Sequence, residues 1–70
     1  MKQFVSHEVT YVEGLRFCQH SLIKENNKAE AYVLIHDIEQ TEELHSELIS
    51  IVEVTKPEAE LMEKIGINYI

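Results

Sequence analysis

The sequence predicts a small α+β domain: an antiparallel sheet of about four strands with two short helices, in the order β-β-β-α-β-α. Three observations support this class. β-Branched and aromatic residues are frequent near the N-terminus, a second apolar run follows an Asn-Asn pair, and a helix-capping box lies near the C-terminus. Seventy residues are enough for one domain, residues 1–70, and too few for two.

The first two strands are expected to form a hairpin, residues 2–12 and 15–24, with a tight turn at Glu13-Gly14. A helix over residues 10–25 is the alternative, because apolar side chains there also have helical spacing. They are Tyr11, Leu15, Cys18 and Leu22. The hairpin is favoured because Gly14 would weaken a helix interior by ~1 kcal/mol and suits a turn.

The middle of the chain is expected to return to the sheet. Residues 29–38 have a nearly continuous apolar centre, which predicts a central strand buried on both faces. Residues 39–47 predict a short helix with Thr41 as a candidate N-cap. Residues 49–54 are β-branched and predict another strand, although a helix continuing through Val54 is the alternative.

The last helix has the clearest start signal. Thr55-Lys56-Pro57-Glu58 is a capping box with proline in the first turn, and Gly66 is a suitable end. The expected buried stripe is Leu61, Met62 and Ile65. The apolar tail, residues 67–70, is expected to add an edge strand or to pack on a partner subunit.

Size and cysteine content bear on environment and assembly. The single cysteine, Cys18, cannot form an internal disulfide, which favours a reducing compartment. The start of the chain lacks the apolar run of a secretory signal, and the longest apolar stretch is far shorter than a membrane span. We therefore expect a cytoplasmic protein, in a bacterial cell or a phage-infected host. A small core without a disulfide predicts a homodimer.

Catalytic signals are weak, and the expectation is a non-enzymatic protein without cofactor or metal. Ser6, His7 and Glu8 are strand neighbours, so they cannot form a relay. Cys18 and His20 would share a strand face, but two ligands do not make a zinc site, and His7, His36 and His45 are scattered. Cys18 is expected to be a buried apolar filler. A small metal or thiol protein is therefore the third-ranked function.

Charge is the most informative feature. The net charge of -7 argues against nucleic acid or an anionic membrane as a direct partner. Residues 1–28 hold four bases and three acids, whereas residues 29–70 hold two bases and ten acids. The stretch between Ala29 and Thr55 has no lysine or arginine. Its acidic residues, the predicted partner-binding set, are Glu30, Asp37, Glu39, Glu42, Glu43, Glu47 and Glu53.

Glu39, Glu43 and Glu47 would form a row at i, i+4 and i+8 on the expected short helix. Such a row resembles a phosphate backbone in sign and coarse pitch. The leading hypothesis is a DNA mimic that occupies the basic surface of a bacterial histone-like or other DNA-binding protein and blocks DNA binding. The alternative is a regulatory interaction module that binds through strand edges and apolar contacts. Those contacts, also the candidate dimer contacts, are Tyr32, Ile67, Tyr69 and Ile70.

Overall fold

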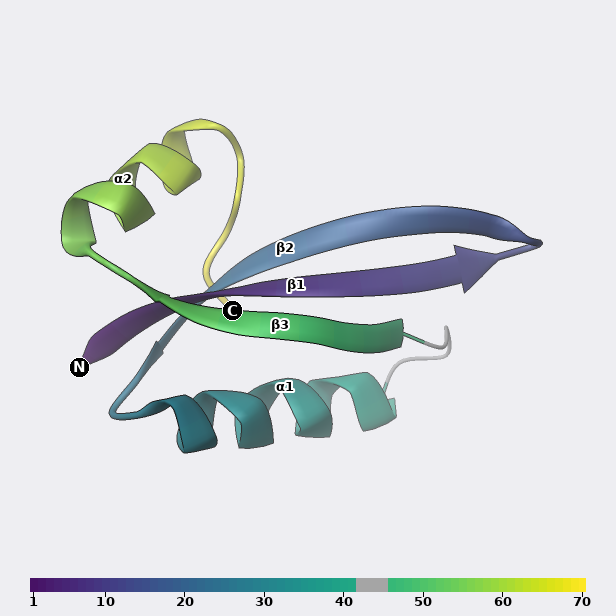
Figure 1. The fold of residues 1–70 in the computed structure, drawn as a ribbon, viewed down its shortest axis with the longest axis horizontal. Coiled ribbons are helices and arrows are strands. Elements are labelled where there is room, and N and C mark those ends of the chain that lie inside the picture. Colours follow the sequence, from purple (N-terminus) through teal and green to yellow (C-terminus); the bar gives the residue numbers. More distant parts are fainter. Residues whose placement is uncertain (42–45) are drawn as a thin grey trace.

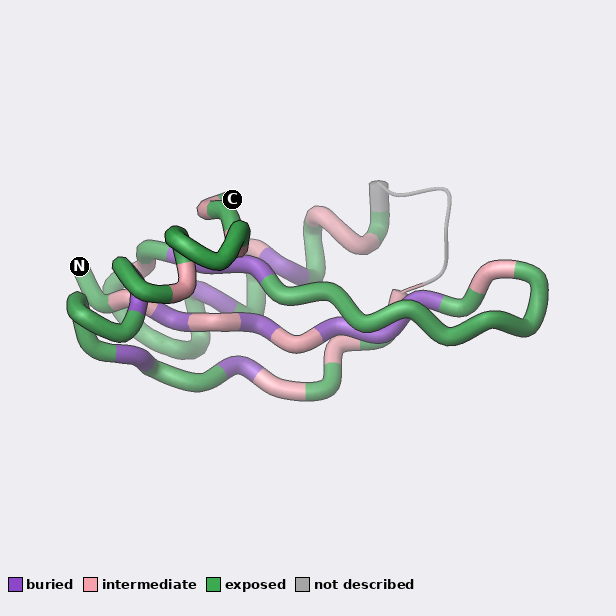
Figure 2. The backbone as a smooth tube through the Cα atoms, turned by 90° about the horizontal axis from the view of Figure 1, so that it is seen from above, coloured by how far each residue is buried: buried purple, intermediate pink, exposed green. Residues whose placement is uncertain are grey.

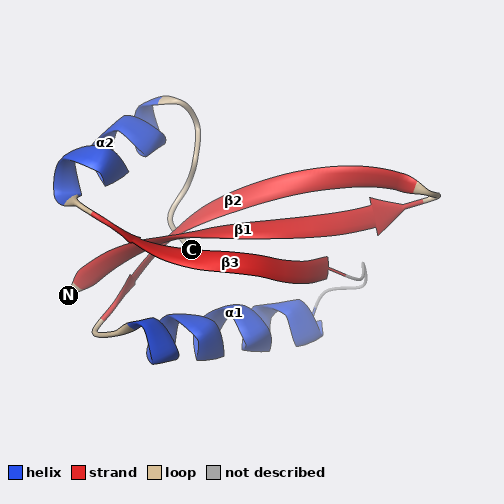
Figure 3. Cartoon of the chain, viewed as in Figure 1, coloured by secondary structure: helices blue, strands red, loops and turns tan. Residues whose placement is uncertain are grey.

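A computed structural model describes residues 1–41 and 46–70 (Figure 1). The elements in chain order are β1 (Lys2–Val12), β2 (Leu15–Glu25), α1 (Lys28–Thr41), β3 (Ser46–Val54) and α2 (Lys56–Lys64). The strands form one antiparallel sheet in the order β2-β1-β3 (Figure 3). The α+β class is confirmed, but the described residues contain three strands, where about four were predicted.

The predicted N-terminal hairpin is confirmed. β1 and β2 pair without a register shift from Lys2 opposite Glu25 to Val12 opposite Leu15. The turn residues Glu13 and Gly14 have φ values of 51° and 80°. Two positive φ values are typical of a type I′ turn. The twist of this turn matches the right-handed twist of the paired strands.

Residues 29–38 were predicted to be a strand, and this is wrong because they belong to helix α1. Asn27 Oδ1 accepts a hydrogen bond of 2.9 Å from the backbone N–H of Glu30, which caps the start of the helix. Ala31 and Ile35, four residues apart, are fully buried on one face, while Tyr32 and Val33 are exposed. The apolar run is thus a helix with one buried face, not a strand buried on both faces.

The expected helix over residues 39–47 is also wrong at both of its ends. α1 ends at Thr41, the residue expected to begin a helix, and β3 begins at Ser46. The expected strand over residues 49–54 is confirmed as part of β3 and pairs with β1. A register shift between His7 and Glu8 leaves one extra residue in β3, Ile49, which forms a bulge.

Helix α2 begins as predicted. Thr55 Oγ1 accepts from the Glu58 N–H at 3.3 Å, and Glu58 Oε1 accepts from the Thr55 N–H at 2.9 Å. Of the predicted stripe, Met62 is confirmed, but Leu61 and Ile65 are wrong. Ala59 and Met62 face the sheet, whereas Leu61 and Ile65 are exposed. Gly66 follows the helix with a φ of 98°, as a left-handed cap residue does.

Two small cores lie on opposite faces of the sheet, because neighbouring strand residues point in opposite directions. Phe4 and Ile23 pack with Ala31, Ile35 and Ile51 under α1. The adjacent residues Val5 and Leu22 instead pack with Val54, Ala59 and Met62 under α2. Figure 2 shows the buried positions in the part of the sheet that the helices cover, whereas the turn end of the hairpin is exposed.

The turn end of the hairpin extends past the rest of the fold. β3 pairs with β1 only from Gln3 to Thr10, and the molecule is 37 Å along its longest axis. Figure 1 shows this end of β1 and β2 reaching beyond β3 and α1. Leu15 and Phe17 are exposed there.

The tail after α2 lies along the outer edge of β2, but it forms one isolated bridge and not the edge strand that was one of the two expected arrangements. Tyr69 forms a parallel β-bridge with Leu22.

Across the described residues, no helix is long and apolar enough to cross a membrane.

Candidate protein-binding surface

The outward face of α1 carries apolar side chains that the domain does not cover. Tyr32 is 42% exposed and Val33 is 60% exposed, although the next apolar residues along the helix are largely buried. Helical geometry explains the contrast, because residues one and two positions from the buried Ala31 turn away from the sheet. Tyr32 and Val33 therefore form an apolar strip that faces solvent. Two shallow depressions lie beside this strip, one on each side of Val33.

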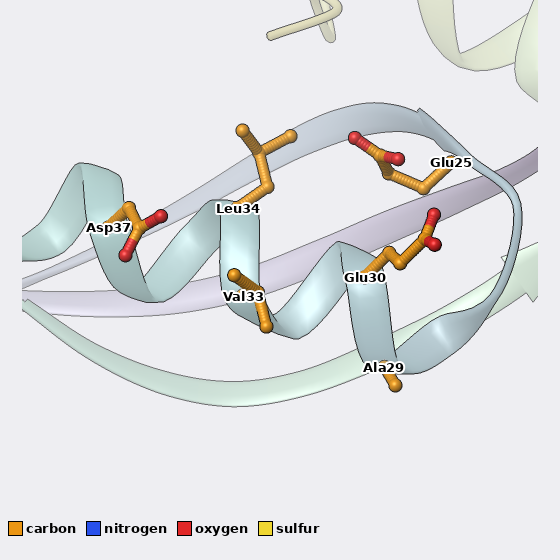
Figure 4. Close-up of a pocket in the computed structure, with 6 residues that line it drawn as sticks. All are labelled: Glu25, Ala29, Glu30, Val33, Leu34 and Asp37. Atoms are coloured by element: carbon orange, nitrogen blue, oxygen red, sulfur yellow. The ribbon is translucent and has the colours of Figure 1, made fainter.

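The first depression, about 360 Å³ and open to solvent, lies along the start and middle of α1 (Figure 4). Val33 and Leu34 form its apolar part, and three carboxylates surround them: Glu25, Glu30 and Asp37. Figure 4 shows the carboxylates of Glu25 and Glu30 near the start of the helix, with Asp37 about two turns further along. Glu25 comes from the end of β2 and reaches the helix because the Asn26-Asn27 connection is short.

The second depression, about 350 Å³, lies on the other side of Val33 and is lined by Tyr32, His36, Glu39 and Leu48. Glu39 Oε1 is covered and has no hydrogen-bond partner among the described residues. His36 Nε2 lies 3.4 Å from Gln40 Nε2 one turn along the helix. A covered carboxylate oxygen interacts favourably with a cationic or N–H group, and no described residue supplies one.

We call this region the acidic helix surface, and define it by six residues: Glu25, Glu30, Tyr32, Val33, Asp37 and Glu39. Its carboxylates are not neutralised within the described residues, where the one salt bridge joins Lys2 to Glu53 at 3.6 Å on another part of the molecule. The last turn of α1 has no basic residue and contains Glu39. Because a helix C-terminus carries partial negative charge, this arrangement attracts a cation.

The predicted carboxylate row does not form on one helix. Glu39 lies in α1 and Glu47 lies exposed in β3, while Glu42 and Glu43 are outside the described residues. Glu53 is exposed on β3 and pairs with Lys2. Of the predicted set, the structure brings together Glu30, Asp37 and Glu39. Sequence reasoning missed Glu25, because residues 29–38 were assigned to a strand and not to a helix beginning just after it.

The predicted apolar contacts separate into two groups. Tyr32 belongs to the acidic helix surface. Ile67 and Tyr69 pack against Leu22 and Val54 of the same chain, and Ile70 is half exposed at the end of the tail. The tail therefore contributes to the fold of its own domain.

The cysteine and histidine positions form a different group on the sheet. Cys18 is exposed, so the expectation that it fills the core is wrong. It shares a face of β2 with His20, whose ring stacks on that of His7 with centroids 4.8 Å apart. His20 Nδ1 also lies 3.2 Å from the carbonyl oxygen of Ser6. Within residues 1–41 and 46–70, no three His, Cys, Asp or Glu side chains gather to hold a metal ion, and His45 lies outside those residues.

Ser6, His7 and Glu8 occupy alternating faces of β1, as their sequence spacing implied. Ser6 is fully buried, and its Oγ accepts from the Ser21 N–H at 3.2 Å. This serine fills a structural position between the two strands of the hairpin.

No protein-family model, curated protein or solved structure matches the chain. The residues of the acidic helix surface are therefore the basis for assigning a function.

Proposed function

We propose that this chain is a non-enzymatic binding protein whose acidic helix surface docks on the basic surface of a DNA-binding protein and excludes DNA from it. A bacterial histone-like protein is the kind of partner that fits this chemistry. The observation that carries the proposal is the exposed apolar strip of α1 between two depressions bordered by carboxylates, none of which has a basic partner in the described residues.

The electrostatics favour a cationic protein over other ligands. Glu25, Glu30 and Asp37 would interact with lysine or arginine side chains that otherwise contact phosphates. DNA itself would be repelled, because both surfaces carry negative charge.

The apolar strip favours a protein over a simple cation. Tyr32 and Val33 lie between the carboxylates, and their burial on docking would contribute hydrophobic stabilisation. The resulting arrangement, an apolar centre with a charged rim, is typical of a protein interface.

The proposal is tested by competition. A labelled DNA duplex is bound to a histone-like protein, and fluorescence anisotropy follows its release as this protein is added. We expect release by the parent and a loss of competition of about tenfold or more for the double variant Glu30→Gln/Asp37→Asn, at about 1 kcal/mol for each carboxylate. Added salt should weaken binding by the parent, because exposed charge pairs are screened over ~8 to 10 Å.

The matched control is Glu60→Gln/Glu63→Gln on the exposed surface of α2, which removes the same charge from a helix elsewhere. If both double variants lose competition to the same extent, the loss reflects the change in net charge, and the acidic helix surface is not the binding site. Failure of the parent to release DNA from a panel of basic DNA-binding proteins would reject the proposed function itself.

A further inference from the structure

The outer edge of β2 presents unpaired backbone groups. Leu22 directs its N–H and C=O away from β1, and they bond to Asn68 O and Ile70 N, each at 2.9 Å. Along a strand of an antiparallel pair, the backbone N–H and C=O groups of one residue bond to the partner strand, and those of the next residue point away from it. The register with β1 is unbroken, so Arg16, Cys18 and His20 also direct their backbone groups outward. No described residue pairs with them.

This free edge is a defined window, residues 16–20. The turn at Glu13-Gly14 limits it at one end, and the tail bonded to Leu22 limits it at the other. The window contains no lysine, proline or bulge, which are the features that usually prevent strand edges from pairing with another chain. The opposite edge, β3, has a bulge at Ile49 and exposed Glu47 and Glu53.

We propose that the β2 window pairs antiparallel with the same window of a second copy, about a two-fold axis at Cys18, to give a continuous six-stranded sheet. A window of five residues centred on Cys18 is complementary to itself in this arrangement. About six interchain backbone hydrogen bonds would form, from Arg16, Cys18 and His20 of each copy.

The charges of the chain favour this edge for a second copy. Each copy has a net charge of -7, but the window contains one charged residue, Arg16, and no acid. Approach through β3 or α1 would bring carboxylates together, whereas approach through β2 keeps the acidic helix surfaces apart. The β2 edge is thus where like-charge repulsion between copies is weakest.

The side chains gain contacts in the same arrangement. Leu15 and Phe17 share the face of the sheet that α1 covers further along, and they are 63% and 52% exposed. In the dimer, Phe17 lies opposite Gln19 of the second copy and diagonal to its Phe17, at a distance that aromatic side chains span. The pairing would thus reduce the exposed apolar area of the hairpin.

Equilibrium sedimentation tests the dimer directly. We expect a mass of twice 8.2 kDa at micromolar concentration. Cys18→Pro removes an outward N–H without removing a bond to β1, and it should raise the dimer dissociation constant by about tenfold or more. Cys18→Ser retains the N–H and should leave the constant nearly unchanged. Arg16→Pro is a second edge variant, and circular dichroism checks that each variant folds.

Cross-linking with copper phenanthroline and dissolved oxygen tests the register without any proline variant. Two Cys18 residues across the axis would have Cα atoms ~5.5 Å apart, which a disulfide can span. In a Cys18→Ser background, Arg16→Cys of one copy lies opposite His20→Cys of the other, so the mixture should cross-link. Arg16→Cys alone should not, because its two copies would be about 13 Å apart along the strands.

A monomer at ~100 µM would overturn the proposal. So would equal dissociation constants for Cys18→Pro and Cys18→Ser, or cross-linking of Arg16→Cys alone as fast as that of the mixture. The dimer does not depend on DNA competition, so its failure and the failure of the proposed function are distinguishable. In this dimer both α1 helices lie on the same face of the sheet, which would present two acidic helix surfaces to a two-fold symmetric partner.

Discussion

Tyr69 lies beside Leu22 in a parallel β-bridge, and the C-terminal tail is thereby fixed to the edge of its own sheet. Leu22 N–H donates to Asn68 O and Leu22 O accepts from Ile70 N–H. The Tyr69 hydroxyl accepts from Gln3 Nε2 at 3.5 Å, and Lys24 Nζ lies 4.8 Å from the centre of the tyrosine ring. The tail therefore closes the core under α2.

We predict that deletion of residues 68–70 lowers the free energy of unfolding by roughly 1–3 kcal/mol, because two backbone hydrogen bonds and partly buried apolar area are lost. Urea denaturation followed by circular dichroism measures this. Asn68→Ala, which retains the backbone bonds, is the control and should unfold close to the parent. An unchanged urea midpoint for the deletion would show that the tail does not stabilise the domain.

The start of α2 makes stability depend on pH. The backbone N–H of Thr55 donates to the Glu58 carboxylate, and this bond, with a smaller effect of the Thr55 side chain, lowers the pKa of Glu58 below its usual value. A lowered pKa in the folded state favours folding at a pH above the unfolded pKa. That contribution is lost as the pH falls through the folded pKa.

We therefore expect Glu58→Gln to lower the melting temperature at neutral pH and to have less effect in acid. The difference from the parent should shrink below about pH 4. Parallel thermal melts across this range measure it, with Glu60→Gln as the control in the same helix. A difference that is constant with pH would mean that the charge of Glu58 does not stabilise the helix start.

The hairpin turn contains an unfavourable residue. Glu13 has a φ of 51°, a left-handed conformation that asparagine adopts more readily than glutamate. We predict that Glu13→Asn, which creates the Asn-Gly pair preferred in two-residue hairpins, stabilises the domain by roughly 0.5–1 kcal/mol. Chemical denaturation checks the sign, and Glu13→Val, which should destabilise it, is the opposing control.

Elements with local signals were predictable from the sequence. The hairpin follows from Gly14 and the alternating strand residues, and α2 follows from the reciprocal bonds of Thr55 and Glu58. Both signals act between residues close in sequence, so they do not depend on how the rest of the chain packs.

The middle of the chain was not predictable in the same way. A short apolar run has no period that separates a buried strand from a helix, and residues 29–38 show this. The signal that decides between them is Asn27, which caps α1 but belongs to a residue type that is equally common in turns. This one assignment changed the candidate site, because it separated Glu39 from Glu47 and brought Glu25 beside Glu30.

Two positions of α1, two residues apart, distinguish residues that stabilise the fold from residues that are available for binding. Ile35 is fully buried between the helix and the sheet, whereas Val33 is 60% exposed on the acidic helix surface. We predict that Ile35→Ala costs about 2–5 kcal/mol, because it leaves a cavity in a small core. A domain of this size has only about 3–5 kcal/mol of stability, so this variant should be largely unfolded at 25 °C.

Val33→Ala should change stability by less than about 0.5 kcal/mol, because the side chain is exposed and alanine favours the helix. It should nevertheless weaken competition with DNA, since Val33 lies between the two depressions. Urea denaturation and the anisotropy assay distinguish the two effects. If Val33→Ala competes as well as the parent while Glu30→Gln/Asp37→Asn does not, docking depends on charge alone and the apolar strip is not part of the interface.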